Sequence, residues 1–308
     1  MDSQKYDIVV VGELNPDLIV SGNVVPEFGQ IEKLVDKAIL TVGSSSAICA
    51  CGAAKLGLRV AFIGKVGDDI FGRFMCQSLS EQGIDINGIV TDKEVPTGIS
   101  IILSTGSDRA ILTSLGTIPR LEYTDIDLKI IKNTRHLHVG SYYLLEQLRA
   151  DLPILFDFTH ECGISISLDT NYDPLKKWRN GLEQLLEKVD ILLPNSTECC
   201  AIAGMPNLDQ AVDYLRTKVH YLAVKLGDKG ALLCKDHNKY YTDPIRVEVV
   251  DTVGAGDSFD AGFIYGYLAG WTPGRILKFA TICGSLSTRK AGGIDAQPNF
   301  REANSYVN

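Results

Sequence analysis

The chain has 308 residues, of which 45% are hydrophobic and 22% charged, as is ordinary for a globular protein with one large core. Its net charge of −8 argues against nucleic acids and anionic membranes as main partners, because both attract basic surfaces. No apolar run is long enough to cross a bilayer, and Met1 to Lys5 have neither secretory nor transit character. We therefore expect a cytoplasmic protein.

The cysteines agree with a reducing compartment. Two pairs of cysteines have a spacing that metal ligands can have: Cys49-x-Cys51, and the adjacent residues Cys199 and Cys200. Neither has a histidine or a second cysteine pair at the spacing that zinc sites use. Most of the cysteines stand among apolar residues, so the sequence favours free thiols that pack as small core side chains.

The first predicted strand is the apolar run from Tyr6 to Val11, which ends at Gly12. Such a run is typical of a strand buried on both faces of a parallel sheet. Asn15 and Asp17 follow at the carboxyl end of this strand, where open α/β sheets place their ligands. They offer donors and acceptors for sugar hydroxyls, although an Asx-Pro turn is the plainer explanation of Asn15-Pro16.

Two pairs of short strands interrupt the α/β pattern and predict a small β-sheet lid drawn from about residues 13–41 and 96–116. The first pair is Leu18–Val20 with Ala38–Leu40, and the second is Ile99–Leu103 with Ala110–Leu112, around a polar turn at Thr105–Asp108. Arg109 lies just past that turn. It is placed to reach either a substrate oxygen or solvent, and the sequence does not separate the two.

The segment after the first strand pair predicts two helices joined by a strand. Thr41 to Ser46, with Gly43 and Ser44, opens a helix over 47–56, and its serines either cap the helix or leave N–H groups for a polar ligand. A strand at 60–63 and a glycine loop at 64–72 lead to a helix over 71–82. The spacing of a Walker A loop occurs nowhere, which excludes classic P-loop chemistry.

The middle of the chain alternates strands with helices, which predicts a mostly parallel sheet flanked by helices on both faces. The strands are expected at 135–139, 165–168, 190–193 and 221–225. His136 and His138 share one face of their strand, and a structural pair is favoured over a metal site because no third ligand lies nearby. Asn195 and Glu198 have the spacing of a capping box.

The most informative stretch is Asp251-Thr252-Val253-Gly254-Ala255-Gly256-Asp257, between a predicted strand at 247–250 and an apolar helix. Such a turn aims free N–H groups and the positive end of the helix dipole at one point, and its glycines let a ligand come close. An acid there weakens simple anion binding, so Asp257 needs another role. It is suited to take a proton from an attacking hydroxyl, or else it merely caps the helix.

The complete run from Asp251 to Asp257 resembles the C-terminal signature of the ribokinase-like carbohydrate kinases of the pfkB type. Three further segments resemble that family in the expected order, namely 12–17, 64–72 and 195–198. The resemblance extends over nearly the whole chain and implies a ribokinase-like α/β fold in a single kinase domain, residues 1–308. It also implies a lid that often forms dimer contacts.

The resemblance implies an ATP- and Mg²⁺-dependent kinase that phosphorylates a hydroxyl of a sugar, of the fructokinase or ribokinase type. Asp257 would be the base, with Gly254, Ala255 and Gly256 as the anion hole. The resemblance implies three further sets of roles. The first is substrate binding by Asn15, Asp17, Gly43, Ser44, Arg109 and Asp257, and the second is nucleotide binding by Asn195, Lys225, Gly227, Gly254 and Gly256. The third is cation binding by Glu198, through water to Mg²⁺, and by Asp251, to a monovalent cation such as K⁺.

Three positions depart from the family pattern. Ser44 replaces a second glycine, and Ile48 stands where an asparagine that touches the sugar is expected. Asp173 replaces the basic residue of a D-x-N-x-R segment, whose acid and amide, here Asp169 and Asn171, the resemblance implies to face the active cleft. If the transferring phosphate needs a cation, Lys176, Lys177 or Arg109 would have to supply it. These departures keep other substrates open: a nucleoside, a sugar acid or a sugar phosphate. An inactive sugar-binding regulatory module is the alternative from another class, whereas a nicotinamide dehydrogenase lacks its glycine motif after the first strand.

Overall fold

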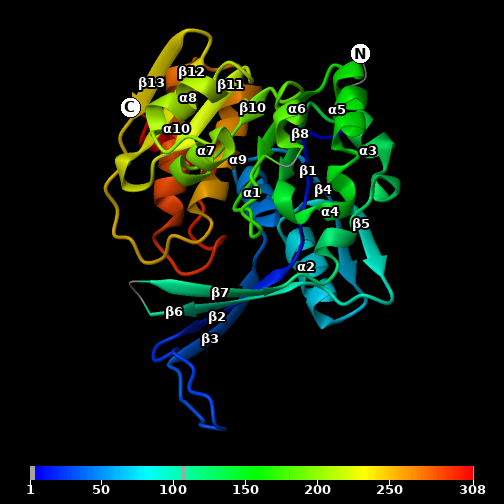
Figure 1. The fold of residues 1–308 in the computed structure, drawn as a ribbon, viewed down its shortest axis with the longest axis vertical. Coiled ribbons are helices and arrows are strands. Elements are labelled where there is room, and N and C mark those ends of the chain that lie inside the picture. The colour runs from blue at the N-terminus through cyan, green and yellow to red at the C-terminus, as the bar shows by residue number, and fades with distance from the viewer. Residues whose placement is uncertain (1–3, 106–107, 180, 308) are drawn as a thin grey trace.

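The computed structural model describes residues 4–105, 108–179 and 181–307, which form one large and one small β-sheet (Figure 1). The large sheet has the strand order β13-β12-β11-β10-β9-β8-β1-β4-β5. Pairing is parallel from β5 to β11 and antiparallel at β12 and β13. The strands are β1 (Ile8–Val11), β4 (Val60–Gly67), β5 (Asp85–Asp92), β8 (His136–Gly140), β9 (Ser165–Asp169), β10 (Ile191–Leu192), β11 (Tyr221–Lys225), β12 (Ala231–Lys235) and β13 (Asn238–Thr242).

β1 lies inside this sheet and shows why its sequence is apolar without a break. Val9 and Val11 pack into the core on one face, and Ile8 and Val10 pack into the core on the other. Successive side chains of a strand point to opposite faces, so a strand covered on both sides must be apolar throughout. The predicted mostly parallel sheet between two helical layers is therefore confirmed.

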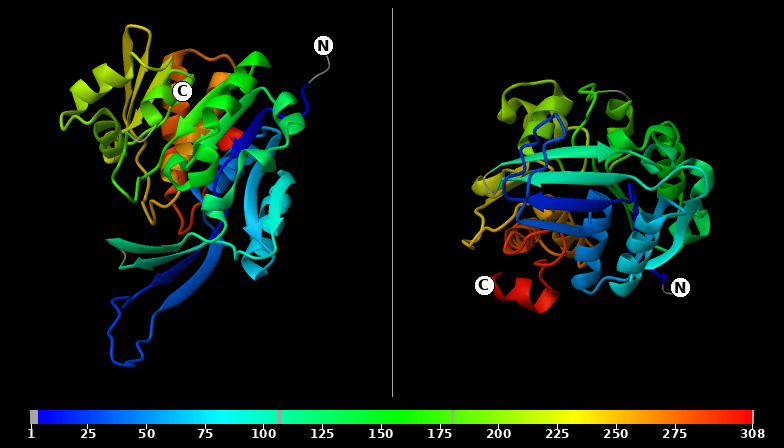
Figure 2. Two further views of the ribbon diagram at one scale, coloured as in Figure 1. Left: turned by 45° about the vertical axis from the view of Figure 1, so that its right-hand side comes forward. Right: turned by 90° about the horizontal axis from the view of Figure 1, so that it is seen from below.

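The two helical layers come from different parts of the chain (Figure 2). One face carries α3 (Leu128–Lys132), α4 (Glu146–Arg149), α5 (Leu152–Glu161), α6 (Leu182–Leu186), α7 (Ser196–Ala203) and α8 (Leu208–Leu215). The other carries α1 (Ser45–Lys55), α2 (Ile70–Glu81), α9 (Ala255–Leu268), α10 (Pro273–Ser287) and α11 (Phe300–Ser305). α9 packs against both α1 and α10, which explains why it is apolar nearly all round. Within the described residues, no helix is long and apolar enough to cross a membrane.

The small sheet has the strand order β3-β2-β6-β7 and projects from one end of the large sheet (Figure 1). Its strands are β2 (Pro16–Ser21), β3 (Lys37–Val42), β6 (Ile99–Ser104) and β7 (Arg109–Ser114). The two outer pairs are antiparallel and the central pair, β2 with β6, is parallel. The second, smaller sheet that the sequence predicted is thus present, whereas Gly106 and Ser107 of the predicted turn lie outside the described residues. We call this sheet the lid.

The two faces of the lid differ in composition, because alternate residues of a strand point to opposite sides. On one face, paired residues form a polar row, Thr41, Asp17, Ser100 and Thr113, followed by an isoleucine row, Ile39, Ile19, Ile102 and Ile111. The opposite face carries two apolar rows: Leu40, Leu18, Ile101 and Leu112, then Ala38, Val20, Leu103 and Ala110. The first face is the one that covers the candidate site described below.

The strand predicted at Val247 to Val250 is wrong. After β13 the chain leaves the sheet, and residues 243–249 have no regular secondary structure. Val249 and Val250 are 59% and 57% exposed, while Val247 packs against the helices. The β-branched residues that suggested a strand here line a cavity and face solvent, so tertiary context overrides their local preference.

His136 and His138 form a buried polar chain with two serines of β9. The ring nitrogens of His136 lie 2.7 Å from Ser165 Oγ and 2.7 Å from Ser167 Oγ, and His138 Nδ1 lies 2.8 Å from Ser167 Oγ. Burial, the largest influence, lowers the pKa of His136 to about 3 and that of His138 to about 4. This arrangement supports the structural interpretation of the pair.

We predict that both imidazoles stay neutral well below their ordinary titration range. In ¹⁵N NMR spectra, the ring shifts of His136 and His138 should not change between pH 7.5 and about pH 5.5, because protonation would place a charge in the core. Asn variants at each position identify the resonances. A midpoint near the unperturbed histidine value, about 6.5, would contradict the prediction.

Candidate active site

Two cavities meet at the first turn of α9, beside the edge of the large sheet where the parallel strands end. The lid cavity, about 320 Å³, lies against the polar face of the lid, and its lining includes Gly254 and Asp257. The α10 cavity, about 740 Å³, lies against α10, and its lining includes Ala255 and Gly256. Neighbouring residues of one turn therefore form a wall that both cavities share.

The backbone of this turn is set by Gly254. Its φ is +73°, and an added Cβ would lie 2.8 Å from Gly293 Cα, so a side chain is excluded on both grounds. The first bond along the helix is from Ser258 N–H to Gly254 O, at 2.9 Å. The N–H groups of Gly256 and Asp257 precede that bond, whereas Ala255 N–H donates to Thr252 O at 3.3 Å. Ala255, one of the residues expected to form the anion hole, therefore uses its N–H group to close the turn, which leaves the N–H groups of Gly256 and Asp257 to face a ligand.

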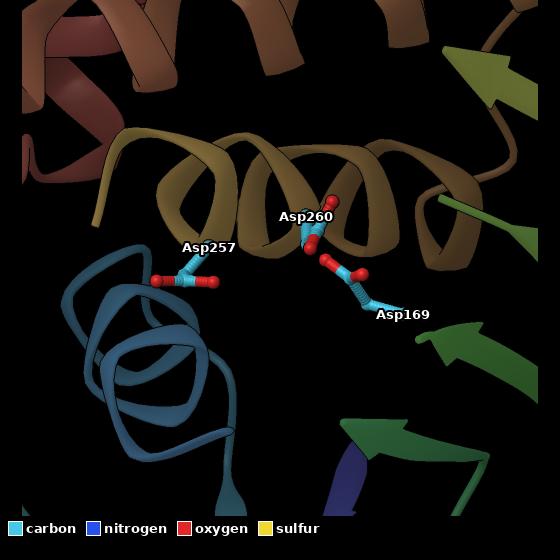
Figure 3. Close-up of side chains that lie close together, drawn as sticks. All are labelled: Asp169, Asp257 and Asp260. Atoms are coloured by element: carbon cyan, nitrogen blue, oxygen red, sulfur yellow. The ribbon is translucent and has the colours of Figure 1, made fainter. Parts of the chain in front are cut away.

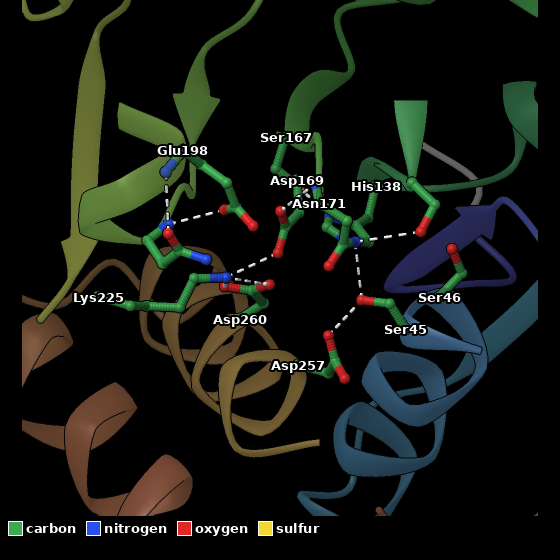
Figure 4. Close-up of polar contacts among 12 residues, drawn as sticks. Ser45, Ser46, His138, Ser167, Asp169, Asn171, Glu198, Lys225, Asp257 and Asp260 are labelled. Carbon is green, nitrogen blue, oxygen red and sulfur yellow. Dashed lines mark hydrogen bonds and ion pairs between the residues drawn. The ribbon is translucent and has the colours of Figure 1, made fainter. Parts of the chain in front are cut away.

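Asp257 does not cap its helix. The N-cap is Gly254, and α9 has no side-chain cap. Instead, the Asp257 carboxylate accepts a hydrogen bond from Ser45 Oγ, and Ser45 Oγ in turn accepts one from Asn171 Nδ2 at 2.9 Å (Figure 4). Burial is the main reason that the pKa of Asp257 is raised to about 7, while the Ser45 hydrogen bond acts in the opposite direction. A carboxyl group with this pKa is suited to accept a proton near neutral pH.

Three buried carboxylates gather behind the turn. One oxygen each from Asp169, Asp257 and Asp260 lie within 4.8 Å of one another, at the end of β9 and along α9 (Figure 3). Lys225 Nζ lies 2.6 Å from Asp169 Oδ2 and 3.1 Å from both oxygens of Asp260. The lysine ammonium therefore supplies the positive charge that these two acids need.

The pKa shifts in this cluster follow from burial and from that lysine. Burial is the largest single influence on the pKa of Asp169 and would raise it, but the charge and hydrogen bond of Lys225, together with hydrogen bonds from Asp260 and the Asn171 N–H group, hold the pKa below its usual value. Burial raises the pKa of Asp260 well above the ordinary range. The pKa of Lys225 is raised despite burial, because Asp169, Asp260 and Glu198 surround it with negative charge.

The predicted substrate residues at the lid are brought together. Asn15 and Asp17 are buried and line the lid cavity, where Asn15 Nδ2 lies 3.3 Å from Ser100 Oγ. Burial, together with the charge of Glu13, raises the pKa of Asp17 to about 7. Gly43 does not line the cavity, but an added Cβ there would lie 2.2 Å from Asp17 Oδ1. Gly43 therefore leaves the space in which the Asp17 carboxylate sits.

The residues that depart from the family pattern at α1 have structural roles. Ser44 has a φ of +67°, a conformation that suits glycine, and its hydroxyl accepts a bond from Ala47 N–H at 3.1 Å as the N-cap of α1. Ser44 also lines the lid cavity. Ile48 is buried against Gly293, so close that an added Cβ on that glycine would lie 2.4 Å from Ile48 Cδ1. An apolar side chain thus replaces an amide in the lid cavity wall.

Arg109 reaches from the lid to the loop before α9. Its Nη1 lies 3.6 Å from Asp251 Oδ1 and 3.5 Å from Thr252 Oγ1, and Arg109 also lines the lid cavity. Asp251 accepts further bonds from the N–H groups of Val253 and Gly292, each at 3.0 Å. From the sequence, Arg109 could contact either a substrate or solvent. In the structure it contacts Asp251, a partner that the sequence did not suggest.

Asn195 and Glu198 form the predicted capping box of α7. Asn195 Oδ1 accepts from Glu198 N–H at 2.9 Å, and Glu198 Oε2 accepts from Asn195 N–H at 2.8 Å. Neither residue is among those that line the two cavities. Burial and the nearby charge of Asp169 raise the pKa of Glu198 to about 7, while the charge of Lys225 lowers it. Glu198 therefore interacts electrostatically with the acids around Lys225.

The α10 cavity has apolar side chains in its wall, against which a planar apolar group can pack. Ile245, Val247 and Phe259 line it together with Thr281 and Gly284 of α10. Lys225 and Gly227, which the family resemblance implied to contact a nucleotide, also line this cavity. Gly227 has a φ of +64°, and an added Cβ would meet no atom within 4 Å, so its glycine is needed for the turn and not for packing.

Asp173, which replaces a basic residue of the family pattern, turns into its own loop. Its carboxylate accepts from Leu175 N–H at 2.9 Å and from Lys177 N–H at 2.5 Å, and it is 3% exposed. Lys176 and Lys177 are exposed and line neither cavity. Lys225, by contrast, lines the α10 cavity and pairs with Asp169 and Asp260 at the acidic cluster.

Two members of this site, Ser45 and Asp260, were not predicted from the sequence, whereas the family resemblance implied that Asp169 and Asn171 face the active cleft. A signal existed for Asp260, since it lies three residues after Asp257 and therefore on the same side of the helix. Asp169 and Asn171 follow a predicted strand end, which is where ligand-binding residues of parallel sheets gather. Nothing local marks Ser45, because its partner Asp257 is 212 residues away.

Comparison with known proteins agrees with this geometry. Residues 5–299 match the family model of the pfkB family carbohydrate kinases. A ribokinase of Arabidopsis thaliana is 28% identical over 97% of this chain and 80% of its own. The solved Arabidopsis ribokinase, complexed with ribose and ATP, superimposes with a TM-score of 0.85 at 26% identity, covering 98% of both chains. An Escherichia coli protein assigned as a ribokinase II, solved with ATP and Mg²⁺, has the same fold, with a TM-score of 0.87 at 23% identity over 98% of this chain and 99% of that one.

The chain therefore belongs to the pfkB family of carbohydrate kinases, as the sequence motifs predicted. It is a phosphotransferase that uses an alcohol group as acceptor, since its relatives in this family are named as kinases of sugars. The predicted ribokinase-like fold is confirmed by the structural neighbours.

We predict that Ser45 positions Asp257 and tunes its charge. Because the Ser45 hydroxyl lowers the pKa of Asp257, Ser45→Ala should shift the acidic limb of the kcat/KM profile upward by about half to one pH unit. Ser45→Thr keeps a hydroxyl and should retain the wild-type profile. Superimposable profiles for Ser45→Ala and the wild type would show that the serine has no such role.

Proposed function

We propose that the protein transfers the γ-phosphoryl group of ATP to a hydroxyl group of a small carbohydrate, as a fructokinase or ribokinase does. The observation that carries the proposal is the position of Asp257. Its carboxylate has a pKa raised to about 7 and stands on the wall between two cavities of unequal size. One cavity has polar side chains for a sugar, and the other has apolar walls for a nucleotide base.

In this proposal the nucleotide occupies the α10 cavity. Ile245, Val247 and Phe259 would contact the adenine, and the phosphates would extend past Gly227 toward Gly256. Lys225 lies next to that path, because an added Cβ on Gly256 would be 3.5 Å from its Nζ. The relatives solved with ATP support this assignment of a nucleotide to the fold.

The acceptor occupies the lid cavity, held by Asn15 and Asp17, with Gly43 and Ser44 shaping that side. One hydroxyl lies beside Asp257, which takes its proton as the oxygen attacks the γ-phosphorus and the bond to ADP breaks. The N–H groups of Gly256 and Asp257, with the positive end of α9, stabilise the charge on the transferring group. The lid then excludes water, which limits wasteful hydrolysis of ATP.

A magnesium ion fits the chemistry of the carboxylates near Lys225. Mg²⁺ binds through few carboxylates and keeps several waters, and Glu198 and Asp169 are buried acids close to the proposed phosphate path. When bound, the ion would neutralise charge on the β- and γ-phosphates. Asn195 orients Glu198 through the capping box. In this proposal Asn195 therefore affects nucleotide binding by positioning Glu198, and not by touching the nucleotide.

Three further expectations stay predictions. For the monovalent cation beside Asp251, both carboxylate oxygens already accept N–H bonds and one faces Arg109, so no step is assigned to such an ion. The cytoplasmic location rests on the sequence and agrees with the cysteines, all of which lie in the described residues as free thiols. The third is that residues 1–308 act as a single kinase domain.

We predict that Asp257→Asn lowers kcat by roughly 10²–10⁴-fold, the usual size of a general-base effect. An amide cannot accept the proton, whereas the affinity for ATP should change little. In the wild type, kcat/KM should fall about tenfold per pH unit below about pH 7, because the base is then protonated. Steady-state kinetics with the best sugar of a panel provide both measurements.

The matched control is Asp209→Asn, which changes an exposed acid in the first turn of α8 that lines neither cavity. It should leave kcat and the pH profile unchanged. Near-full activity of Asp257→Asn, or a wild-type profile that is flat down to about pH 5, would show that Asp257 is not the base.

We also propose that the lid joins two copies of the chain. The lid face turned away from the cavity carries the two apolar rows of β3, β2, β6 and β7, and the β2–β3 connection adds Phe28 at 97% exposure and Leu34 at 85%. An apolar surface of this kind is typical of an interaction site. A second copy of the same face is the simplest cover, because its own rows are equally apolar.

We predict a dimer in solution that Leu40→Asp converts to a monomer, because the variant places a charge within an apolar row. Light scattering after size exclusion, at micromolar concentration, distinguishes the two. Ile154→Asp, on an exposed position of α5, is the control and should remain dimeric. A wild-type monomer across that concentration range would contradict the lid interface.

A further inference from the structure

Charge is distributed unevenly around the lid cavity. Among the described residues that line it are three acids, Glu13, Asp17 and Asp257, and one cationic side chain, Arg109. All three acids are withdrawn from solvent, and Glu13 accepts bonds from Ser46 N–H and Ser46 Oγ. Any further negative charge in this space would therefore lie close to poorly solvated carboxylates.

The single cation is already engaged. Arg109 Nη1 lies 3.6 Å from Asp251 Oδ1 and 3.5 Å from Thr252 Oγ1, at the loop that precedes α9. A phosphate or carboxylate group that bound Arg109 would have to compete with the Asp251 carboxylate. Lys225 lines the α10 cavity and not the lid cavity, and it lies between Asp169 and Asp260.

Among the described residues, the remaining walls of the lid cavity offer neutral polar groups and apolar surface but no second cation. The polar row of the lid contributes Ser100 and Thr113, and the next row contributes Ile102 and Ile111. The body of the protein adds the neutral polar side chains of Asn15, Ser44, Ser45, Ser141, Asn171 and Tyr172 and the aliphatic side chains of Ile48, Ile118 and Leu144. Hydroxyls of a neutral polyol can bond to these polar groups while its carbon skeleton packs on the isoleucines, whereas a second charged group finds no cation besides Arg109 to balance it.

From this distribution of charge we infer that the acceptor is an uncharged polyhydroxyl compound, and that the lid cavity rejects sugar phosphates and sugar acids. The inference rests on the proposed function, because it names the class of acceptor for the same reaction. It excludes a kinase that adds a second phosphate to an already phosphorylated sugar. The reactions that supply the acceptor would then be those that release a free sugar, glycoside or nucleoside.

The test uses acceptor pairs that differ in charge: ribose with ribose 5-phosphate, fructose with fructose 6-phosphate, glucose with gluconate, and adenosine with its 3′-phosphate. ADP formation gives kcat/KM for each compound with Mg²⁺ and ATP. We expect the neutral member of the best pair to be favoured by at least about 100-fold, as an unpaired charge near buried carboxylates requires. A larger kcat/KM for an anionic member of any pair would overturn the inference and leave the proposed function standing. Turnover of none of them would contradict the proposed function itself.

Adding a cation to the cavity should alter this preference. Ile111→Arg places a guanidinium on the cavity face of β7, at a side chain that is 54% exposed and therefore tolerant of the change. It should move the anionic-to-neutral ratio of kcat/KM at least tenfold toward the anionic member. Ile154→Arg is the matched control, since Ile154 is 55% exposed on α5, away from the lid, and lines neither cavity, and its ratio should equal that of the wild type. Equal ratios for Ile111→Arg and Ile154→Arg would overturn the argument from charge.

Discussion

The site depends on one lysine ammonium held among buried acids. Lys225 faces Asp169 and Asp260 at hydrogen-bond distance, and Glu198 and Asp257 lie near enough to influence, or be influenced by, the same charges. One positive charge does not balance four carboxylates that have lost most of their water, so several of their pKa values are raised. A site that holds excess negative charge is prepared for a divalent cation, and it has a proton acceptor that works near neutral pH.

The fold places this charge where two cavities can share it. β1, β8 and β9 are buried on both faces, and their carboxyl ends lead directly into Asn15, Ser141 and Asn171 of the lid cavity wall. α9 is held between α1 and α10, which fixes its first turn at the same edge. The lid supplies the remaining wall through alternate residues of its strands. Buried parallel strands, packed helices and alternating lid residues are all common features, and together they fix the position of Asp257 (Figure 4).

Much of this could be predicted from the sequence, because the signals are local. Unbroken apolar runs identified the parallel strands, and the run from Asp251 to Asp257 identified the turn before α9. What could not be predicted depends on partners far apart in the chain. Ser45 meets Asp257 across 212 residues, and Lys225 meets Asp169 across 56. Val247 to Val250 form no strand, because Val247 packs against helices while Val249 and Val250 face solvent. The departures at Ser44, Ile48 and Asp173 became interpretable only when their contacts were known: a cap, a contact with Gly293 and a loop closure.

The central claim is that a phosphoryl group crosses the first turn of α9 from the α10 cavity to the lid cavity. A crystal structure with Mg²⁺, ADP, aluminium fluoride and an accepted sugar tests it most directly. The account predicts the fluoride group at the N–H groups of Gly256 and Asp257, with one sugar hydroxyl between it and the Asp257 carboxylate. A fluoride group bound away from this turn, or a sugar with every hydroxyl out of reach of Asp257, would contradict the account.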